Sequence, residues 1–310
     1  MGISWPDEVD EVIGGDLAAG VVYATPAKGV VIAPMAPLGL RDRERGTITV
    51  TTSLGLWKKL DRIRANPSIA VAFHARDHGD SERTEFVLVQ GTGTFSTTPD
   101  RAWLESIGEQ WEHFLGPIRG GLAGRWMDVY YWQRVGIEID VRRVVVWPDP
   151  SCSGEPVVHG DPLPPAPAAQ SAPKNGVAPR TDAARLAKEI GRLPHSLLGW
   201  VGGDGLPIAV SVEAGEVGPE GVGLLIPDSV RPEGGRRAGL TAHEFMPRMI
   251  GQEQHIYTGW LDVTGDRAVY APHTRAGYKL PASKVLFTLA AGGGTRAGIR
   301  KAREKGLAPG

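Results

Sequence analysis

Apolar residues in the first half of the chain recur mainly as short runs rich in β-branched side chains, which is the pattern of strands. Thr47–Thr52 is β-branched at nearly every position, and two apolar runs flank a Pro-Ala-Lys-Gly turn, which indicates a hairpin. The strands predicted in this half are Gly20–Thr25, Val30–Pro34, Thr47–Thr52, Ile69–His74, Glu85–Ser96 and Val135–Trp147.

Helical spacing appears between these strands. Apolar residues at i, i+4 and i+7 predict a helix over Leu54–Ala65 with Ser53 as its N-cap. Asn66-Pro67 ends that helix, because a residue before proline disfavours the α region. Further helices are predicted over Pro99–Phe114 and Trp126–Arg134. The resulting order of strands and helices suits a small closed barrel, since closure removes exposed sheet edges.

The second half repeats this plan in reduced form, which indicates an internal duplication. Its first two strands flank a Gly-Gly-Asp-Gly turn, as in a hairpin. The strands predicted here are Leu197–Val201, Pro207–Val212, Val222–Ile226, Ala238–His243, His255–Val263, Arg267–Tyr270 and Ser283–Leu289. We therefore expect a mainly β chain with helices (α+β), built as two tandem six-stranded antiparallel barrels.

Composition divides the chain into four segments. Residues 1–147 form the first predicted barrel domain, and residues 148–180, rich in Pro and Ala, read as an unpacked linker in which Cys152 is an exposed thiol. Residues 181–291 form a second, degenerate barrel domain. Residues 292–310 begin with a glycine break and continue as a short basic helical tail.

The bulk numbers describe an ordinary globular protein. Of 310 residues, 41% are apolar and 22% charged, so each half is large enough to bury a core. A net charge of −1 does not favour a nucleic-acid partner. No apolar run reaches membrane-spanning length, the N-terminus lacks a secretory h-region, and a single cysteine excludes a disulfide framework. A cytoplasmic protein without membrane contact is expected.

The stretch from Thr47 to Thr94 combines five features in order: a strand ending in Thr/Ser, a helix with a basic pair, Asn-Pro, an apolar strand, and a strand with glycines near its end. This arrangement resembles the pyridoxamine 5′-phosphate oxidase-like, FMN-binding split-barrel superfamily. The resemblance implies that each tandem barrel is a split β-barrel. It also implies a cofactor, with FMN first, the deazaflavin coenzyme F-420 as the alternative, and haem third.

The resemblance places the cofactor phosphate at Lys58 and Lys59, in the positions of the superfamily's basic pair before Asn-Pro. A helix start with cationic side chains suits a phosphate, and Thr51, Thr52 and Ser53 add hydroxyl donors. The two lysines are about 100° apart around a helix, and we favour Lys59 if only one contacts phosphate. No metal site is expected, and no catalytic side chain is identified.

The sequence departs from pyridoxamine-phosphate oxidases where Glu85-Phe86 replaces their Arg-Gln, so their particular reaction is not expected. We expect a flavin- or deazaflavin-dependent oxidoreductase acting on a small organic substrate. The alternative is a non-catalytic flavin, deazaflavin or haem carrier. The ring of such cofactors lies at a dimer interface in the superfamily, so the resemblance implies a homodimer, or an internal pseudo-dimer in which the second half supplies the interface.

Several histidines are weighed as ligands. His74, Arg76 and His78 follow a strand and are candidates for a cofactor edge or a haem ligand, although loop histidines are more often surface residues. His243-Glu244 begins like a His-Glu-x-x-His zinc motif, but Pro247 stands where its second histidine belongs. Aromatic residues clustered between Trp103 and Trp132 suit core packing or stacking on a ring.

Overall fold

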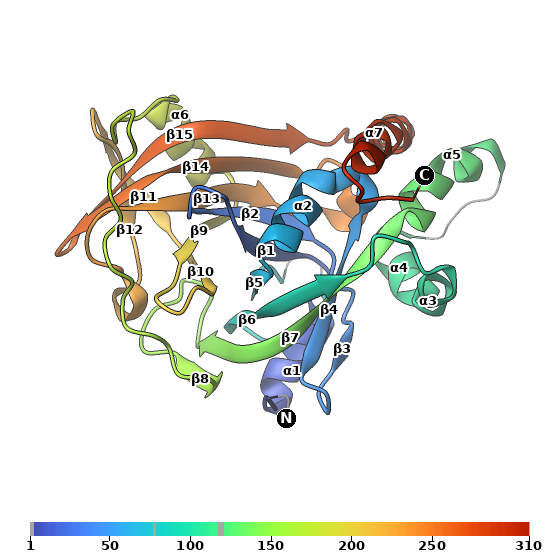
Figure 1. Cartoon of the computed structure of the whole chain (residues 1–310), viewed down its shortest axis with the longest axis horizontal. Helices are drawn as coiled ribbons and strands as arrows, with labels where there is room; N and C mark the ends of the chain where they lie inside the picture. The colour runs from blue at the N-terminus through green and yellow to red at the C-terminus, as the bar shows by residue number, and fades with distance from the viewer. Residues whose placement is uncertain (1–2, 77–78, 117–120, 310) are drawn as a thin grey trace.

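The computed structural model describes residues 3–76, 79–116 and 121–309, and it contains two antiparallel sheets with helices at their margins (Figure 1). The first sheet contains β1 Ala19–Ala24, β2 Val30–Met35, β3 Arg41–Asp42, β4 Thr47–Ser53, β5 Ser68–Phe73, β6 Phe86–Phe95, β7 Arg134–Trp147 and β8 Val157–Gly160. The second contains β9 His195–Val201, β10 Pro207–Ser211, β11 Glu213–Gly218, β12 Gly221–Leu225, β13 Arg236–Glu244, β14 Glu253–Thr264 and β15 Arg267–Lys279.

Helices occupy the connections and both ends of the chain. The α-helices are α1 Asp7–Gly15, α2 Trp57–Ala65, α3 Arg101–Ser106, α4 Gly108–Leu115, α5 Gly121–Trp132, α6 Ala183–Arg192 and α7 Lys284–Glu304. The 3-10 turns are η1 Leu54–Leu56, η2 Asp228–Val230 and η3 Pro247–Met249. Among the described residues, no helix has the length and apolar character needed to cross a membrane.

Both sheets have the same topology. The first runs β2-β1-β5-β6-β7-β4-β3, with β8 added beside β7, and the second runs β10-β9-β13-β14-β15-β12-β11. Each strand from β1 to β7 therefore has a counterpart from β9 to β15. The predicted fold class, α+β with two tandem antiparallel barrel-type sheets, is confirmed. The sheets have eight and seven strands where six each were predicted, because the short strands β3, β8 and β11 lack an apolar run.

The strand registers also correspond. In β6 the ladder shifts at Gly91, and in β14 it shifts at Gly259, so these bulges are equivalent positions. Gly91 of β6 pairs with Ile69 of β5, and Gly259 of β14 pairs with Ala238 of β13. His74 and His243 follow Ile69 and Ala238 at the same distance along the chain, so they are counterparts. These two imidazoles meet, with their Nε2 atoms 2.8 Å apart. The two halves are thus related by an internal pseudo-twofold arrangement, and this histidine pair joins equivalent positions across it.

The two halves share a core. One buried cluster combines first-half residues such as Phe86 and Trp147 with Leu198, Trp200 and Leu240 of the second half. The sheets approach so closely that a Cβ added at Gly239 would lie 2.4 Å from the carbonyl oxygen of Val30. Burial of apolar area between the sheets stabilises both at once. A second buried cluster is formed mainly by first-half residues, and Ile299 and Ala302 of the C-terminal region pack into it.

The C-terminal region differs from the sequence prediction. The strand predicted over Ser283–Leu289 is wrong, because these residues begin helix α7, which continues through the glycines predicted to break it. Strand β15 extends to Lys279 and already pairs with both β14 and β12, so the sheet needs no further closing strand. The glycines are tolerated because α7 packs closely: a Cβ added at Gly292 would lie 2.3 Å from Trp126 Nε1.

The Pro-rich segment after β7 lies against the protein. Strand β8 pairs with β7, and the backbone N–H of Gln170 donates to the Gly235 carbonyl oxygen at 2.7 Å. Cys152, expected to be an exposed thiol, is fully buried instead, and its Sγ accepts a hydrogen bond from the Ser211 amide at 3.5 Å. Pro and Ser composition predicted an unpacked segment, but the surface of the second sheet provides hydrogen-bond partners for its backbone.

Candidate functional site

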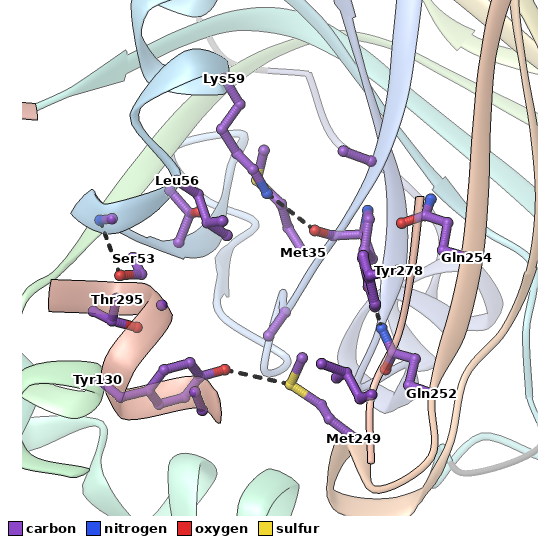
Figure 2. A pocket seen from close by; sticks show the side chains of 18 of the residues that line it. Met35, Ser53, Leu56, Lys59, Tyr130, Met249, Gln252, Gln254, Tyr278 and Thr295 are labelled. Carbon is purple, nitrogen blue, oxygen red and sulfur yellow. Dashed lines mark hydrogen bonds between the residues drawn. The ribbon is translucent and has the colours of Figure 1, made fainter. Parts of the chain in front are cut away.

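A cavity of about 600 Å³ lies between the two halves. The ends of β2 and β4 and the start of α2 form one side, β14 and β15 form another, and α7 contributes part of the wall. Figure 2 shows Lys59 reaching into it from α2, with Tyr278 and Gln252 on the other side. Its volume is within the range of small-molecule and cofactor sites.

All five residues predicted to contact a cofactor line this one cavity: Thr51, Thr52, Ser53, Lys58 and Lys59. The predicted helix begins one turn later than expected, because Leu54–Leu56 forms the 3-10 turn η1. Ser53 caps this turn, with its Oγ accepting from the Gly55 amide at 3.1 Å. The structure therefore brings the predicted residues together, and cofactor binding by them stays a prediction.

The two lysines differ as their helical positions require. Lys59 is 7% exposed, and its Nζ donates to the Pro34 carbonyl oxygen at 3.2 Å. Lys58 is exposed at the rim, with Nζ 5.9 Å from the centroid of the Trp57 ring. A ligand inside the cavity thus meets Lys59 first.

Arg134 is a cavity residue that the sequence analysis missed. It begins β7, directly opposite Ser53 of β4, and it is 5% exposed. Its Nη2 lies 3.4 Å from Thr51 Oγ1, and its guanidinium carbon lies 4.1 Å from the centroid of the Trp111 ring. Within the part of the chain that the structure describes, the guanidinium atoms Nε and Nη1 have no hydrogen-bond partner. Only the pairing of β4 with β7, which connects distant parts of the sequence, indicates this role.

The electrostatics of the cavity favour an anion. Burial, followed by the nearby Arg134 charge, lowers the pKa of Lys59 to about 7. Burial also lowers the pKa of Arg134. Among the described residues, no aspartate or glutamate lines the cavity, so these two buried cations have no carboxylate beside them there. Buried charges require a partner, and an anionic ligand that accepts from both side chains would provide one.

The opposite wall presents an unused acceptor. Gln254 of β14 is 2% exposed, and its Nε2 donates to Thr241 Oγ1 at 2.9 Å, which holds the amide in place. Its Oε1 has no partner. Gln252 donates to the Tyr278 hydroxyl at 2.7 Å. Apolar and aromatic side chains fill most of the remaining wall, among them Met35, Leu56, Phe114, Tyr130 and Phe287. This arrangement fits a flat ring with an N–H donor at its edge.

Helix α7 closes the cavity beside the basic helix. A Cβ added at Gly298 would lie 2.0 Å from the Gly55 carbonyl oxygen, so α7 touches η1 backbone to backbone. Trp126 Nε1 donates to Thr288 O at 3.1 Å and fixes the opposite end of the contact. Phe287 and Thr295 of α7 face the cavity. The segment predicted as a separate basic tail is therefore part of the site wall.

The histidines considered as ligands lie elsewhere. His74 and His243 are 4% and 1% exposed, bond to each other, and are absent from this cavity's lining. Arg76 pairs with Asp16 at 2.6 Å, and His78 lies outside the described residues. Within residues 3–76, 79–116 and 121–309, no group of three or more His, Cys, Asp or Glu side chains is arranged to hold a metal ion.

Comparisons with known proteins give structural matches alone. No protein-family profile matches the chain, and no curated protein matches it. A conserved hypothetical protein of Mycobacterium tuberculosis is 20% identical, with 49% of this chain and 89% of that chain covered and a TM-score of 0.35. A protein from Clostridium acetobutylicum that is related to general stress protein 26 (pyridoxinephosphate oxidase family) is 12% identical. The match covers 49% of this chain and 90% of that chain, with a TM-score of 0.35.

A third solved structure, titled F420 reductase, is 17% identical, with 45% of this chain and 98% of that chain covered and a TM-score of 0.31. Each of the three covers about half of this chain, the extent of one of its two tandem halves.

Proposed function

We propose that the cavity between the two halves binds a phosphorylated flavin-type cofactor, with FMN as the first candidate, and that the protein is an oxidoreductase acting on a small organic substrate. The observation that carries this proposal is the pair of buried cations, Lys59 and Arg134, in a cavity whose described lining residues include no acidic side chain. A phosphate monoester carries a charge of about −1.5 to −2 near pH 7, which matches two cations.

The described residues fit such a group. Lys59, Arg134 and the unpartnered Thr52 hydroxyl would hold the phosphate, and Gln254 Oε1 would accept from a ring N–H. A flavin-type ring supplies hydride transfer when bound, so the protein needs few acids or bases of its own. The chain's residues bind the anion, orient the ring between apolar side chains, and exclude water.

The cavity supports an internal pseudo-dimer as the functional unit. Gln254 and Tyr278, from the second half, line the same cavity as Lys59 and Arg134 from the first. This shared lining supports a site that is completed within one chain. We propose that one chain binds one cofactor without a second copy.

The first experiment is a titration of the protein with FMN, followed by absorbance and fluorescence, on wild type, Lys59→Met and Arg134→Met. Each substitution removes a charged hydrogen-bond donor, so binding is expected to weaken about ten- to hundredfold. Lys58→Met, which removes an exposed charge from the same helix, is the matched control and is expected to change affinity about twofold or less. A thermal melt of every variant confirms folding.

Parallel titration with coenzyme F-420 decides between the two flavin-type cofactors. Tight binding of either, weakened by the two buried substitutions, supports the proposal. Turnover with a reduced nicotinamide or a reduced deazaflavin donor then distinguishes an oxidoreductase from a carrier that binds the same cofactor without reaction. Failure of both FMN and F-420 to bind the folded wild-type protein would overturn the proposed function.

A further inference from the structure

The outward side of helix α7 carries exposed apolar side chains. Nine large apolar side chains are exposed among the described residues, and five of them lie on α7 or on elements that contact it. Val285, Leu286 and Leu289, in the first turns of α7, are 69%, 57% and 54% exposed. Positions i, i+1 and i+4 lie within about 100° of one another around a helix, so these three side chains share one side of α7.

The other two exposed side chains come from the neighbours of α7, which lies against both α2 and α5 (Figure 1). Trp126 of α5 is 38% exposed, and its indole donates to the Thr288 carbonyl oxygen at 3.1 Å. Leu56 is 54% exposed and belongs to η1, which α7 touches at Gly298. Leu56 and the exposed Ala290 also line the cavity between the two halves. These five exposed side chains, called the α7 patch below, therefore border the mouth of that cavity.

Positive charge surrounds the α7 patch. Residues 57–65 and 284–305 hold ten of the 34 lysines and arginines of the chain and two of its 35 aspartates and glutamates. Arg64 donates to the carbonyl oxygens of Lys305 and Gly306, so the two segments meet at the end of α7. The whole chain has a net charge of −1, so this face is positive while the rest of the chain is negative.

Several of these cations are free to meet a partner. Lys58, Arg300 and Lys301 are exposed and have no hydrogen bond or ion pair to any residue that the structure describes. Arg300 follows Leu289 by about three helical turns, so both lie on the same side of α7. The outward side of α7 is thus apolar in its first turns and basic in its last.

This combination complements a bilayer that contains anionic lipids, whose surface offers acyl chains and negative head groups together. A second copy of the chain docked face to face would bring two positive surfaces together, and like charges repel. The centres of protein interfaces are enriched in aromatic residues and depleted of lysine, whereas the α7 residues of this patch are aliphatic. Exposed apolar patches of this kind mark sites of interaction.

We propose that the α7 patch docks the protein on the surface of a bilayer containing anionic lipids. Leu286 and Leu289 enter the outer part of the acyl layer, and Arg300 and Lys301 contact the lipid phosphates. The expectation of a protein without membrane contact rests on the lack of a spanning apolar run, and surface docking needs no such run. Docking does not depend on the proposed cofactor or reaction.

The test is co-sedimentation of the whole chain with vesicles of phosphatidylcholine alone and of phosphatidylcholine mixed equally with phosphatidylglycerol. Binding to the anionic vesicles at low ionic strength is expected, with release as salt screens the charges. Leu286→Ser/Leu289→Ser is expected to weaken this binding at least about tenfold, because less apolar area enters the bilayer. Leu225→Ser, 64% exposed on β12, is the matched control and is expected to bind as wild type.

A second pair of variants tests the charges. Arg300→Gln/Lys301→Gln is also expected to weaken binding to the anionic vesicles at least about tenfold, because each cation near such a surface contributes to attraction. Lys174→Gln/Lys188→Gln removes the same charge from exposed positions outside the two basic segments and is expected to change binding about twofold or less. A thermal melt of every variant checks that it is folded.

Absence of binding to the anionic vesicles, or equal binding by wild type and the folded Leu286→Ser/Leu289→Ser variant, would overturn the proposal. Equal binding to phosphatidylcholine alone would contradict it as well, since the cations would then have no part. A dimer in light scattering that dissociates in the same leucine variant would assign the patch to a second copy instead. FMN titration of these variants reports on the cavity separately, so a failure of docking is distinguishable from a failure of the proposed function.

Discussion

Acid is expected to destabilise the contact between the two halves through His74 and His243. Burial, and then the nearby His195, lowers the pKa of His74 to about 3. Burial and the other two imidazoles also lower the pKa of His243 well below its usual value. Arg76 adds a further repulsive charge near His74. Both imidazoles are therefore neutral in the folded protein near pH 7.

The hydrogen bonds define the neutral tautomers. His74 Nδ1 donates to the Ala72 carbonyl oxygen at 3.0 Å, because a carbonyl can only accept. His74 Nε2 must then accept from the N–H of His243 Nε2. This leaves His243 Nδ1 as a buried acceptor without a partner. Protonation of either ring would break this arrangement or bury a charge.

The sign and size of the effect follow from linkage. In the unfolded chain a histidine titrates near pH 6.5, above the folded pKa, so the unfolded state binds more protons as pH falls. The stabilising contribution is complete above about pH 6.5 and is lost as pH falls toward the folded pKa near 3. At pH 5 the loss is about 2 kcal/mol for His74, and His243, whose pKa is lowered in the same direction, adds to it.

Urea unfolding at pH 7 and pH 5 measures this loss. Other groups titrate in the same range, including Asp16, whose pKa burial raises to about 7, so a reference variant is needed. His74→Leu/His243→Leu removes both titrating groups, and between the two pH values it should lose less stability than wild type, by at least about 2 kcal/mol. His159→Gln, on β8, should behave as wild type. The same loss in wild type and double variant would refute the reasoning.

Three further outcomes are expected. FMN affinity should fall as pH rises above about 7, because Lys59 loses its proton there. Calorimetry in buffers of different ionisation enthalpy should then detect proton uptake when FMN binds at pH 7. An affinity that does not change with pH, together with no proton uptake, would contradict this. Gly298→Ala should lower the melting temperature and weaken FMN binding, because the new Cβ would lie 2.0 Å from the Gly55 carbonyl oxygen. The Cβ of Gly294→Ala would have no atom within 4 Å, so this variant should stabilise α7 by about 1 kcal/mol. Equal melting temperatures of the two variants would argue against the close helix contact. Cys152 should react with a thiol reagent only in denaturant, because burial raises its pKa to about 12; rapid labelling of the folded protein would disagree.

The sequence predicted those residues of the site that belong to one short, continuous motif. Lys58 and Lys59 belong to one continuous motif between Thr47 and Thr94, and the predicted residues of that motif line one cavity. The burial of Lys59 and the exposure of Lys58 follow from their helical separation. Arg134, Gln254 and Gly298 were missed because their roles depend on pairing and packing between segments far apart in the chain.

The sequence by itself determined the repeated order of strands, the position of the basic helix after β4, and the turn residues that begin each half. Strand periodicity, proline and glycine act over a few residues, so these features can be read locally. Only the tertiary structure decided that the two sheets share a buried cluster, that His74 meets His243, and that Lys59 and Arg134 line one cavity with residues of the second half. Burial, desolvation and charge pairing arise when distant segments meet, and these create the uncompensated cations on which the proposed function rests.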